Sequence, residues 1–358
     1  MTRSVSKIPT DSATLARWLA EEPTESVKAL EAFVTRASAS DYGSRREVVR
    51  IALRQAWDEQ PDVFFALLQP WFKAPPARLR WLATGALPVA HEGHRDPCAR
   101  ALRRMATDRD AAVRHLAVEL LGEDLEANLE ALRRWVKDAD PAVRATAARH
   151  LGSAEGEALA KALPLLEALG LDAAADVHWA AVGALVELYE REPRAVLDVA
   201  RALATASDPE VRGAVAAGFF ERVLADAFDA TLPTLRSWLR SGAPELRWTL
   251  VRSLRFVRVT ARSAHLLRVL YEDQDPEIRR CLVAALLDLF EGQPEARGGL
   301  AELLRRARID PSKRVRELLE EGDARFGERF EEVALQAAED GDEGGDPGEA
   351  DDDDDDDE

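Results

Sequence analysis

The sequence is poor in cysteine and aromatic residues and has no long apolar run. Its 358 residues include two cysteines, Cys98 and Cys281, which lie far apart in the chain. This excludes a disulfide framework and indicates a reducing compartment. The first residues lead into an amphipathic segment without the apolar core of a signal peptide, and no run approaches the ~20 apolar residues of a membrane helix. We therefore expect a cytoplasmic protein with no membrane-spanning segment.

Basic charge is absent from the C-terminal end, where acidic charge is concentrated. The net charge is −18, yet residues 339–358 hold fourteen acidic residues and no basic ones, which leaves 52 acidic against 48 basic residues elsewhere. A segment that is low in apolar residues and repels itself does not fold alone. We expect a disordered polyacidic tail that aids solubility. A sharper hypothesis is that it folds back on the arginine-rich stretch 247–262 and competes with a polyanion.

An aliphatic residue followed by arginine recurs along the chain at intervals of 30 to 37 residues. Apolar residues return four and eight positions later, with Asp323 as the exception in the last unit, so each pair marks one buried stripe of a helix. Repeats of this length indicate a solenoid. The pairs are Val49-Arg50, Leu79-Arg80, Val113-Arg114, Val143-Arg144, Val177-His178, Val211-Arg212, Leu246-Arg247, Ile278-Arg279 and Val315-Arg316.

Helix starts are marked by capping residues, and a second helix precedes each of these helices. Asp110, Asp140, Asp208 and Asp275 stand at N-cap positions, and proline follows three of them. Each unit is therefore a helical hairpin that must stack on its neighbours. We expect capping helices over residues 1–38, a repeat solenoid over 39–325, a terminal helix over 326–338 and the tail over 339–358.

The turns resemble those of the HEAT repeat, including its phycobilisome-lyase-like subtype. Aspartate stands six residues before the arginine, best seen in segments 137–152 and 273–287. The resemblance covers about residues 40–325 and implies an all-α, right-handed α-solenoid of about nine two-helix repeats. In that family the turn aspartate and the helix arginine form a hydrogen-bonded ladder between adjacent repeats. That role carries over to Arg114, Arg144, Arg212, Arg247, Arg279, Asp108, Asp138, Asp172, Asp273 and Asp310.

His178 replaces the arginine in the middle of the array, which indicates either drift at a tolerant position or a bend or functional site.

The side of each second helix that faces away from the aliphatic stripe lines the concave surface in HEAT-like solenoids. Tryptophan occurs there at one equivalent position in three repeats. A soluble protein rarely exposes such a stripe without a partner, so we expect a protein or peptide to bind there. The alternative is that the rings pack as additional core. The predicted contacts are Trp81, Trp179, Val186, Phe220 and Trp248, with Arg252 and Arg255 as polar clamps.

A weaker resemblance supports a second function. Segments 78–93 and 175–204 are similar to the HEAT-like bacterial alkylpurine DNA glycosylases, which implies that the same face binds duplex DNA, with base excision if the chain is an enzyme. This chain has His178-Trp179 where those relatives tend to show a paired arginine, and no catalytic aspartate with a supporting arginine is found. A third interpretation, from the repeat subtype alone, is a lyase or chaperone-like subunit that handles a prosthetic group.

Motifs for catalysis and cofactor binding are absent. The sequence has no phosphate-binding Gly-Lys-Ser/Thr loop, no Gly-x-Ser-x-Gly elbow and no His-Glu-x-x-His helix. His91, His94 and Cys98 lie close together, but a fourth ligand and the paired cysteines of structural zinc are missing. We therefore expect a non-enzymatic scaffold with no metal, no cofactor and no small-molecule substrate, and with the DNA-binding interpretation as the alternative.

Overall fold

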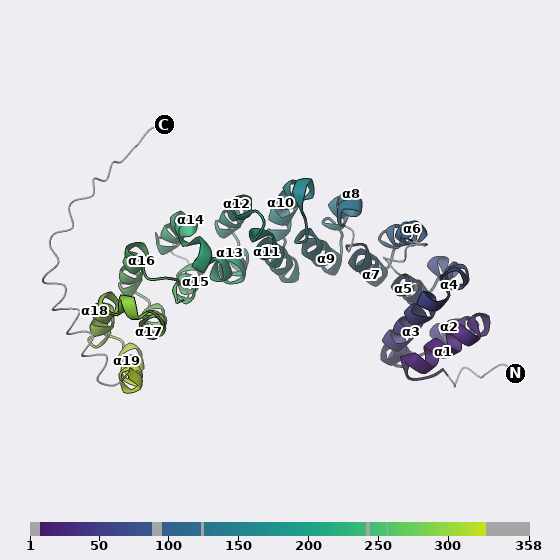
Figure 1. The fold of residues 1–358 in the computed structure, drawn as a ribbon, viewed down its shortest axis with the longest axis horizontal. Helices are drawn as coiled ribbons and strands as arrows, with labels where there is room; N and C mark the ends of the chain where they lie inside the picture. Colours follow the sequence, from purple (N-terminus) through teal and green to yellow (C-terminus); the bar gives the residue numbers. More distant parts are fainter. Residues whose placement is uncertain (1–7, 88–94, 123–124, 241–243, 256, 327–358) are drawn as a thin grey trace. The chain divides into compact units, whose positions relative to one another are not determined.

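A computed structural model describes residues 8–87, 95–122, 125–240, 244–255 and 257–326, and in these ranges every regular element is helical. The chain divides into two compact units, residues 1–203 (unit 1) and residues 204–358 (unit 2). Each unit is a series of stacked helical hairpins (Figure 1). The predicted all-α solenoid of HEAT-like repeats is confirmed. Residues 327–358, with nearly all of the expected terminal helix and the acidic tail, lie outside the described residues.

Unit 1 consists of two layers of helices. Its α-helices are α1 (Ser12–Glu21), α2 (Pro23–Arg36), α3 (Ala39–Glu59), α4 (Pro61–Leu68), α5 (Ala77–Ala86), α6 (Arg95–Met105), α7 (Ala111–Leu121), α8 (Leu125–Trp135), α9 (Pro141–Leu151), α10 (Gly156–Gly170), α11 (Ala175–Tyr189) and α12 (Pro193–Ala204), with a short 3-10 helix η2 (Trp71–Lys73). The odd-numbered α-helices contact one another in series and form what we call the second-helix layer. The even-numbered helices lie on one side of them and form the first-helix layer (Figure 1).

Unit 2 repeats this arrangement. Its elements are α13 (Pro209–Val215), the π-helical turn η3 (Ala216–Phe220), α14 (Glu221–Arg240), α15 (Pro244–Leu254), α16 (Ala261–Tyr271), α17 (Pro276–Gly292), the 3-10 helix η4 (Pro294–Ala296), α18 (Arg297–Ala307) and α19 (Lys313–Phe326). Helices α13, α15, α17 and α19 contact in series as the second-helix layer, and α14, α16 and α18 contact in series as the first-helix layer.

The core lies between the two layers of each unit. The eight aliphatic-arginine pairs and Val177-His178 all fall on second helices. Eight of the nine aliphatic side chains are described, and they expose at most 2% of their surface. The predicted inward stripe is therefore confirmed for these eight. Burial of an aliphatic side chain contributes about 1.5–3 kcal/mol to folding, so one such residue per repeat, with its apolar neighbours four and eight positions later, holds each hairpin against the next.

The predicted caps are also confirmed. The Asp110 carboxylate accepts the N–H groups of Ala112 and Val113 at 3.1 and 3.3 Å. Asp140 accepts the N–H of Ala142 at 2.8 Å, and Asp208 and Asp275 cap α13 and α17 in the same way. These bonds satisfy donors that the first turn of a helix leaves without partners. The aspartates therefore fix the starts of α7, α9, α13 and α17.

Among the described helices, none has the length and the apolar character needed to cross a membrane.

Candidate functional site

Arginine and aspartate side chains join successive repeats along the turns. Arg114 of α7 donates from Nε and Nη2 to the two carboxylate oxygens of Asp138 in the next turn, at 2.9 and 2.7 Å. Its Nη1 donates to the carbonyl oxygen of Asp108 in its own turn at 3.0 Å. Asp138 also accepts the N–H of Asp140 at 2.9 Å. One arginine thus fixes two turns, and the paired aspartate shapes the turn that it occupies.

Four further arginine–aspartate pairs also join a second helix to the next turn. They are Arg80–Asp108, Arg144–Asp172, Arg247–Asp273 and Arg279–Asp310, with shortest N–O distances of 2.7, 2.7, 2.6 and 2.8 Å. In all five pairs each side chain exposes less than a fifth of its surface. We call these five pairs the ladder pairs. Charge-assisted, bidentate pairs of this kind hold geometry firmly.

Hydrogen bonding shifts the pKa values of both partners. The hydrogen bond from Arg144 lowers the pKa of the Asp172 carboxyl from its ordinary 3.8, although burial opposes the shift. For Asp138, burial raises the pKa, but hydrogen bonds from Arg114 and from the N–H of Asp140 outweigh it, and the net change is downward. The pKa of Arg144 is raised by its hydrogen bond to Asp172. These shifts favour the charged forms of Asp138, Asp172 and Arg144.

The middle of the chain departs from this pattern. The ring Nδ1 of His178 lies 3.3 Å from the carbonyl oxygen of Asp172, the position that an arginine occupies in other repeats. Arg212 donates to the carbonyl oxygens of Ala206 and Ser207 in its own turn, both at 2.8 Å. Alanine stands at position 206, whereas aspartate stands six residues before Arg114, Arg144 and Arg279. The departure at His178 is thus accompanied by loss of the turn carboxylate in the following repeat.

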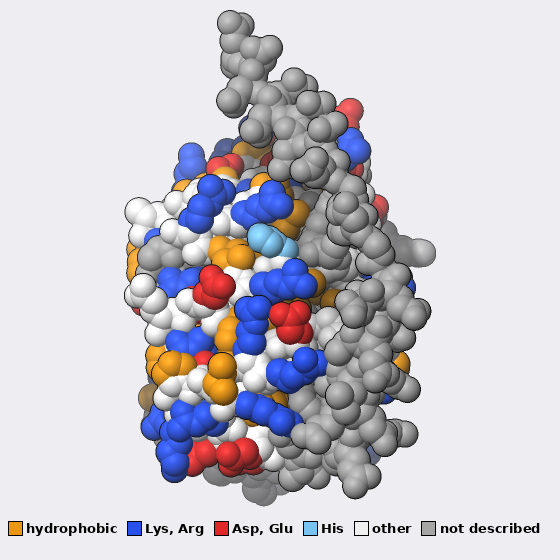
Figure 2. Space-filling model, turned by 90° about the vertical axis from the view of Figure 1, so that its left-hand side faces the viewer, with side chains coloured by type: hydrophobic (Ala, Val, Ile, Leu, Met, Phe, Trp, Pro, Cys, Tyr) orange, Lys and Arg blue, Asp and Glu red, His pale blue; other side chains and the backbone are white. Residues whose placement is uncertain are grey.

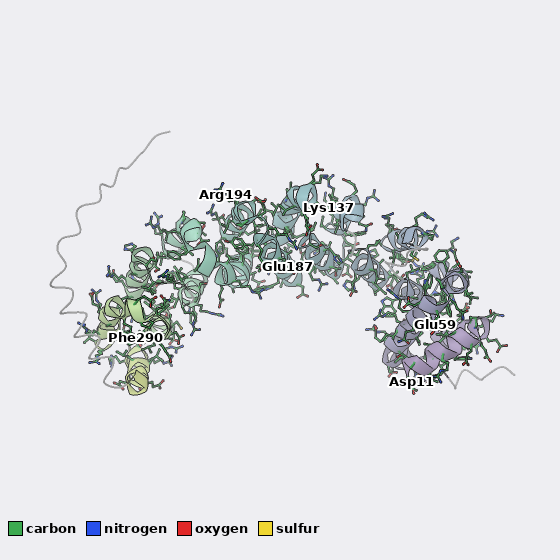
Figure 3. All side chains as sticks on the ribbon, viewed as in Figure 1. Asp11, Glu59, Lys137, Glu187, Arg194 and Phe290 are labelled. Atoms are coloured by element: carbon green, nitrogen blue, oxygen red, sulfur yellow. The ribbon has the colours of Figure 1, made fainter. Side chains whose placement is uncertain are left out.

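Two tryptophans are accessible on the second-helix layer of unit 1. Trp179 of α11 exposes 47% of its surface, and Trp81 of α5 is half-buried. Val186, also predicted as a contact, is half-buried. Gly183 lies one turn after Trp179, and a Cβ atom added there would meet nothing within 4 Å. In Figure 3 Glu187 of α11 lies on this side of unit 1, whereas Arg194 of α12 lies on the first-helix side. We call this side of unit 1 the second-helix face.

A pocket of about 400 Å³ opens beside Trp81. The Arg46 guanidinium lies 5.5 Å from the centre of the Trp81 ring, and Arg50 donates to Glu47 at 2.8 Å. A Cβ atom on Gly85 would lie 2.6 Å from Cδ of Arg50, so the glycine allows Arg50 to lie across α5. Only the second helices α3, α5 and α7 line the pocket, and the lining combines apolar with charged side chains. The lining residues are Arg46, Glu47, Arg50, Trp81, Ala112, His115, Leu116, Glu119 and Leu120.

Phe220 was predicted as an exposed contact, and this is wrong because its side chain is fully buried. It packs edge-on against Phe219, with ring centres 5.3 Å apart. The prediction assumed a step of 100° per residue from Val211, but residues 216–220 form a π-helical turn. Such a turn takes more residues than an α-helical turn, so Phe220 lags behind the expected rotation and points inward with Phe219.

The remaining predicted contacts of unit 2 lie on α15 or, for Arg255, directly after its last residue. Trp248 is half-buried, and Arg252 and Arg255 are exposed. Arg252 donates to the Glu221 carboxylate at 3.1 Å, and Arg255 donates to Asp288 of α17. Both predicted clamps therefore lie against carboxylates of neighbouring elements. Trp179 and Val186 belong to unit 1, whereas Phe220, Trp248, Arg252 and Arg255 belong to unit 2.

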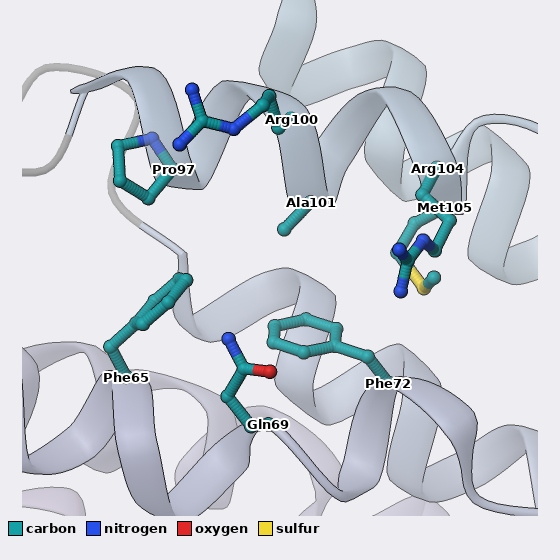
Figure 4. A pocket seen from close by; sticks show the side chains of 8 residues that line it. All are labelled: Phe65, Gln69, Phe72, Pro97, Arg100, Ala101, Arg104 and Met105. Atoms are coloured by element: carbon teal, nitrogen blue, oxygen red, sulfur yellow. The ribbon is translucent and has the colours of Figure 1, made fainter.

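Sequence reasoning missed a second pocket in unit 1, of about 380 Å³, between α4 and α6 (Figure 4). Phe72 and Met105 line it from opposite sides and are buried, and Phe65 is half-buried. The exposed Arg100 and Arg104 line the α6 side, opposite Gln69. The sequence contains a signal for this pocket, because Arg100 and Arg104 lie one helical turn apart on α6. The prediction considered only second helices.

The described residues contain no group of three histidine, cysteine, aspartate or glutamate side chains that could hold a metal ion. His91 and His94 lie outside the described residues. Cys98 is buried, and burial raises the pKa of its thiol to about 11. Its thiol is therefore protonated at neutral pH.

Comparison with known proteins agrees with this architecture. Residues 99–186 match the sequence-family model described as HEAT repeats. Importin beta is similar in structure at 15% identity with a TM-score of 0.52, covering 91% of this chain. A chain from a structure of Kap95p bound to RanGDP is similar at 12% identity with a TM-score of 0.52, covering 87% of this chain. This chain spans 48% and 50% of the length of those two proteins.

Two further findings complete the comparison. The E. coli protein YibA is similar at 17% identity with a TM-score of 0.46, covering 79% of this chain and 98% of YibA. No curated protein matches the sequence. Together, the repeat match, the stacked hairpins and the ladder pairs identify this chain as an all-α solenoid built on HEAT repeats.

Proposed function

We propose that the chain is a non-enzymatic scaffold that binds an extended segment of a partner protein on the second-helix face of unit 1. The observation that carries the proposal is the pair of accessible indoles, Trp81 and Trp179, at equivalent positions of one helix layer. Tryptophan is enriched among the residues that dominate protein interfaces. Stacked repeats are suited to this use, because they present a long, continuous surface.

The spacing of the helices defines the segment that fits. Helices α5, α7, α9 and α11 contact in series, and packed helices lie about 8–10 Å apart. Trp81 and Trp179 are therefore separated by three steps, or about 25–30 Å. An extended chain covers this distance with about eight or nine residues. One apolar side chain of the segment would enter the pocket beside Trp81, and a second would cover Trp179 next to the open space at Gly183.

Charges around the Trp81 pocket favour a segment of mixed charge. Arg46 and Arg50 line the pocket together with Glu47 and Glu119. The two carboxylates would repel a polyanion, and the two guanidinium groups would repel a polycation. A peptide with an apolar anchor flanked by one residue of each sign avoids both repulsions. Complementary charges of this kind determine specificity more than affinity.

The alternative function, binding of DNA as in alkylation repair, depends on Arg252 and Arg255 as phosphate ligands. Both already donate to carboxylates, from Glu221 and Asp288. A phosphate would have to displace these partners, and the neighbouring carboxylates would repel it. We therefore favour the protein partner and keep DNA as an outcome of the test.

The experiment selects peptides of ten residues that bind the full chain, and then measures their affinity for variants by fluorescence anisotropy. We expect Trp81→Ala and Trp179→Ala each to weaken binding about ten-fold or more, the loss typical of an interface anchor. Leu171→Ala is the matched control, because Leu171 is an apolar residue of unit 1 that is 55% exposed and lies in the turn after α10.

Peptides that bind all three variants equally would contradict the proposal. Peptides that lose affinity only with Arg100→Gln and Arg104→Gln would move the site to the pocket of Figure 4. Duplex DNA titrated across a salt series distinguishes the alternative function. Affinity that falls steeply with salt and is lost in Arg252→Ala would favour DNA.

A further inference from the structure

We propose that the first-helix layer of unit 2 carries a basic face that binds the acidic residues 339–358 of the same chain. Residues 258–272 and 295–308, which contain α16 and α18, hold seven arginines against three acidic residues. The two helices contact each other, so their side chains form one continuous surface. We call this surface of α16, α18 and the residues that follow them the basic face.

Several basic side chains of this face are in solvent. Arg268 of α16 and Arg306 of α18 are both exposed, as is His265. Arg306 pairs with Glu302 at 3.1 Å, one turn earlier on α18. Figure 2 views the molecule from the side on which α16, α18 and α19 lie, and Lys and Arg side chains spread over the visible surface with few acidic ones between them. Exposed apolar side chains lie within this face, with Ile309 at 84% and Val269 at 39% exposure.

This position differs from the one that the sequence suggested for the acidic tail. The stretch 247–262 is rich in arginine, but Arg247, Arg252 and Arg255 donate to Asp273, Glu221 and Asp288. These acids lie 26 to 33 residues away in the sequence and become neighbours only in the folded repeat. The excess of basic charge therefore lies on α16 and α18 and not on α15.

Residues 339–358 fit the basic face in charge and in reach. They hold fourteen acidic residues and no basic ones. The described chain ends at Phe326 in α19, which packs against α18. Twelve residues separate Phe326 from residue 339, and at up to about 3.5 Å per residue they reach about 40 Å. Helices of eleven residues are only about 17 Å long, so the acidic segment can cross both.

The strength of this binding depends on the number of ion pairs and on the salt concentration. One exposed ion pair contributes at most about 1 kcal/mol. Several such pairs act together here because the acidic segment is tethered, and a short tether corresponds to a local concentration on the order of 1 mM. Salt at physiological strength screens exposed charges beyond about 8 Å. The contact should therefore tighten at low salt and release at high salt.

The test uses the full chain and a fluorescein-labelled peptide with the sequence of residues 339–358. In a neutral-tail variant of the full chain, every Asp→Asn and every Glu→Gln change is made within residues 339–358. We expect this variant to bind the peptide about ten-fold more tightly than the unaltered chain, whose own acidic segment competes for the face. The affinity for the neutral-tail variant should fall as salt is raised.

Charge removal on the face provides the second half of the test. In the neutral-tail variant, Arg268→Gln with Arg306→Gln should weaken peptide binding about ten-fold. Arg100→Gln with Arg104→Gln on α6 of unit 1 is the matched control and should leave binding unchanged. Circular dichroism and Tm establish that all variants are folded. Equal binding by the unaltered and neutral-tail chains, no binding at all, or an equal loss in the α6 control would overturn the proposal.

Discussion

Asp172 accepts two hydrogen bonds from Arg144 of the preceding repeat, from Nε at 2.7 Å and from Nη2 at 2.8 Å. The same aspartate accepts the N–H of Ala174 at 2.9 Å, and its carbonyl oxygen lies 3.3 Å from Nδ1 of His178. One residue thus links two repeats, shapes its turn and stands where His178 interrupts the ladder. Because these bonds cross between hairpins, they add to the stacking of apolar stripes and fix the register of neighbouring repeats.

Removing a ladder arginine should destabilise unit 1. Arg114→Ala leaves Asp138 in a site where its side chain is 13% exposed, without the guanidinium that it faces. We expect the free energy of unfolding to fall by about 3 kcal/mol, as when one partner of a buried pair is deleted. Urea unfolding followed by circular dichroism measures this. Arg133→Ala is the control, because the Arg133–Glu130 pair is exposed and should cost about 0.5 kcal/mol or less. Equal losses would contradict a special role for the ladder.

The ladder should also make stability depend on acid. The hydrogen bond from Arg144 holds the pKa of Asp172 below its ordinary 3.8 in the folded chain. The unfolded chain therefore takes up a proton first as pH falls, and the stabilisation present above about pH 4 is lost below it. Urea midpoints measured from pH 7 to pH 2.5 should fall most steeply below about pH 4.

Two variants test the origin of this acid sensitivity. Asp172→Asn should make the decline below pH 4 shallower, because the titrating group has been removed. Asp176→Asn, on an exposed residue of α11 in the same unit, should leave the decline as it is. A decline of unchanged slope in Asp172→Asn would show that other carboxylates account for it.

Alanine substitutions of Phe220 and Trp179 should destabilise the chain to very different extents, although the sequence placed both residues on the binding face. Phe220→Ala leaves a cavity beside Phe219 in a fully buried site and should reduce the free energy of unfolding by about 4 kcal/mol. Trp179→Ala removes a side chain that is 47% exposed and should cost about 1 kcal/mol or less. Thermal unfolding of the two variants measures the difference. A large loss for Trp179→Ala would mean that the indole belongs to the core, and the proposed binding face would lose an anchor.

Alanine at Gly183 should stabilise the chain. The glycine lies inside α11, and a Cβ atom there would meet nothing within 4 Å. Replacing a glycine in a helix by alanine contributes about 0.5–1 kcal/mol. Gly122→Ala is the contrast, since its Cβ would lie 2.0 Å from the His150 ring, and it should destabilise. Tm values show whether each substitution stabilises or destabilises the chain. A fall in Tm with Gly183→Ala would indicate that the space beside Trp179 is filled.

Local sequence patterns are enough to predict most of the fold. The aliphatic stripe at a helical period, the Asp-Pro helix starts and the recurrence every 30 to 37 residues depend only on neighbours in sequence, so the amino-acid sequence is enough to predict them. The ladder partners follow a spacing that recurs from repeat to repeat. The candidate site was harder to predict, because exposure of a side chain depends on what packs against it from other helices.

The sequence by itself determined that this chain forms stacked helical hairpins, since apolar residues at a helical period cannot be buried by one hairpin alone. Only the tertiary structure decided which residues of the outer faces are accessible and which charges are already paired. A π-helical turn rotated Phe220 into the core, and Glu221 and Asp288 came to lie against Arg252 and Arg255. Burial and ion pairing are properties of neighbours in space, and residues about thirty positions apart become neighbours only when the repeats stack.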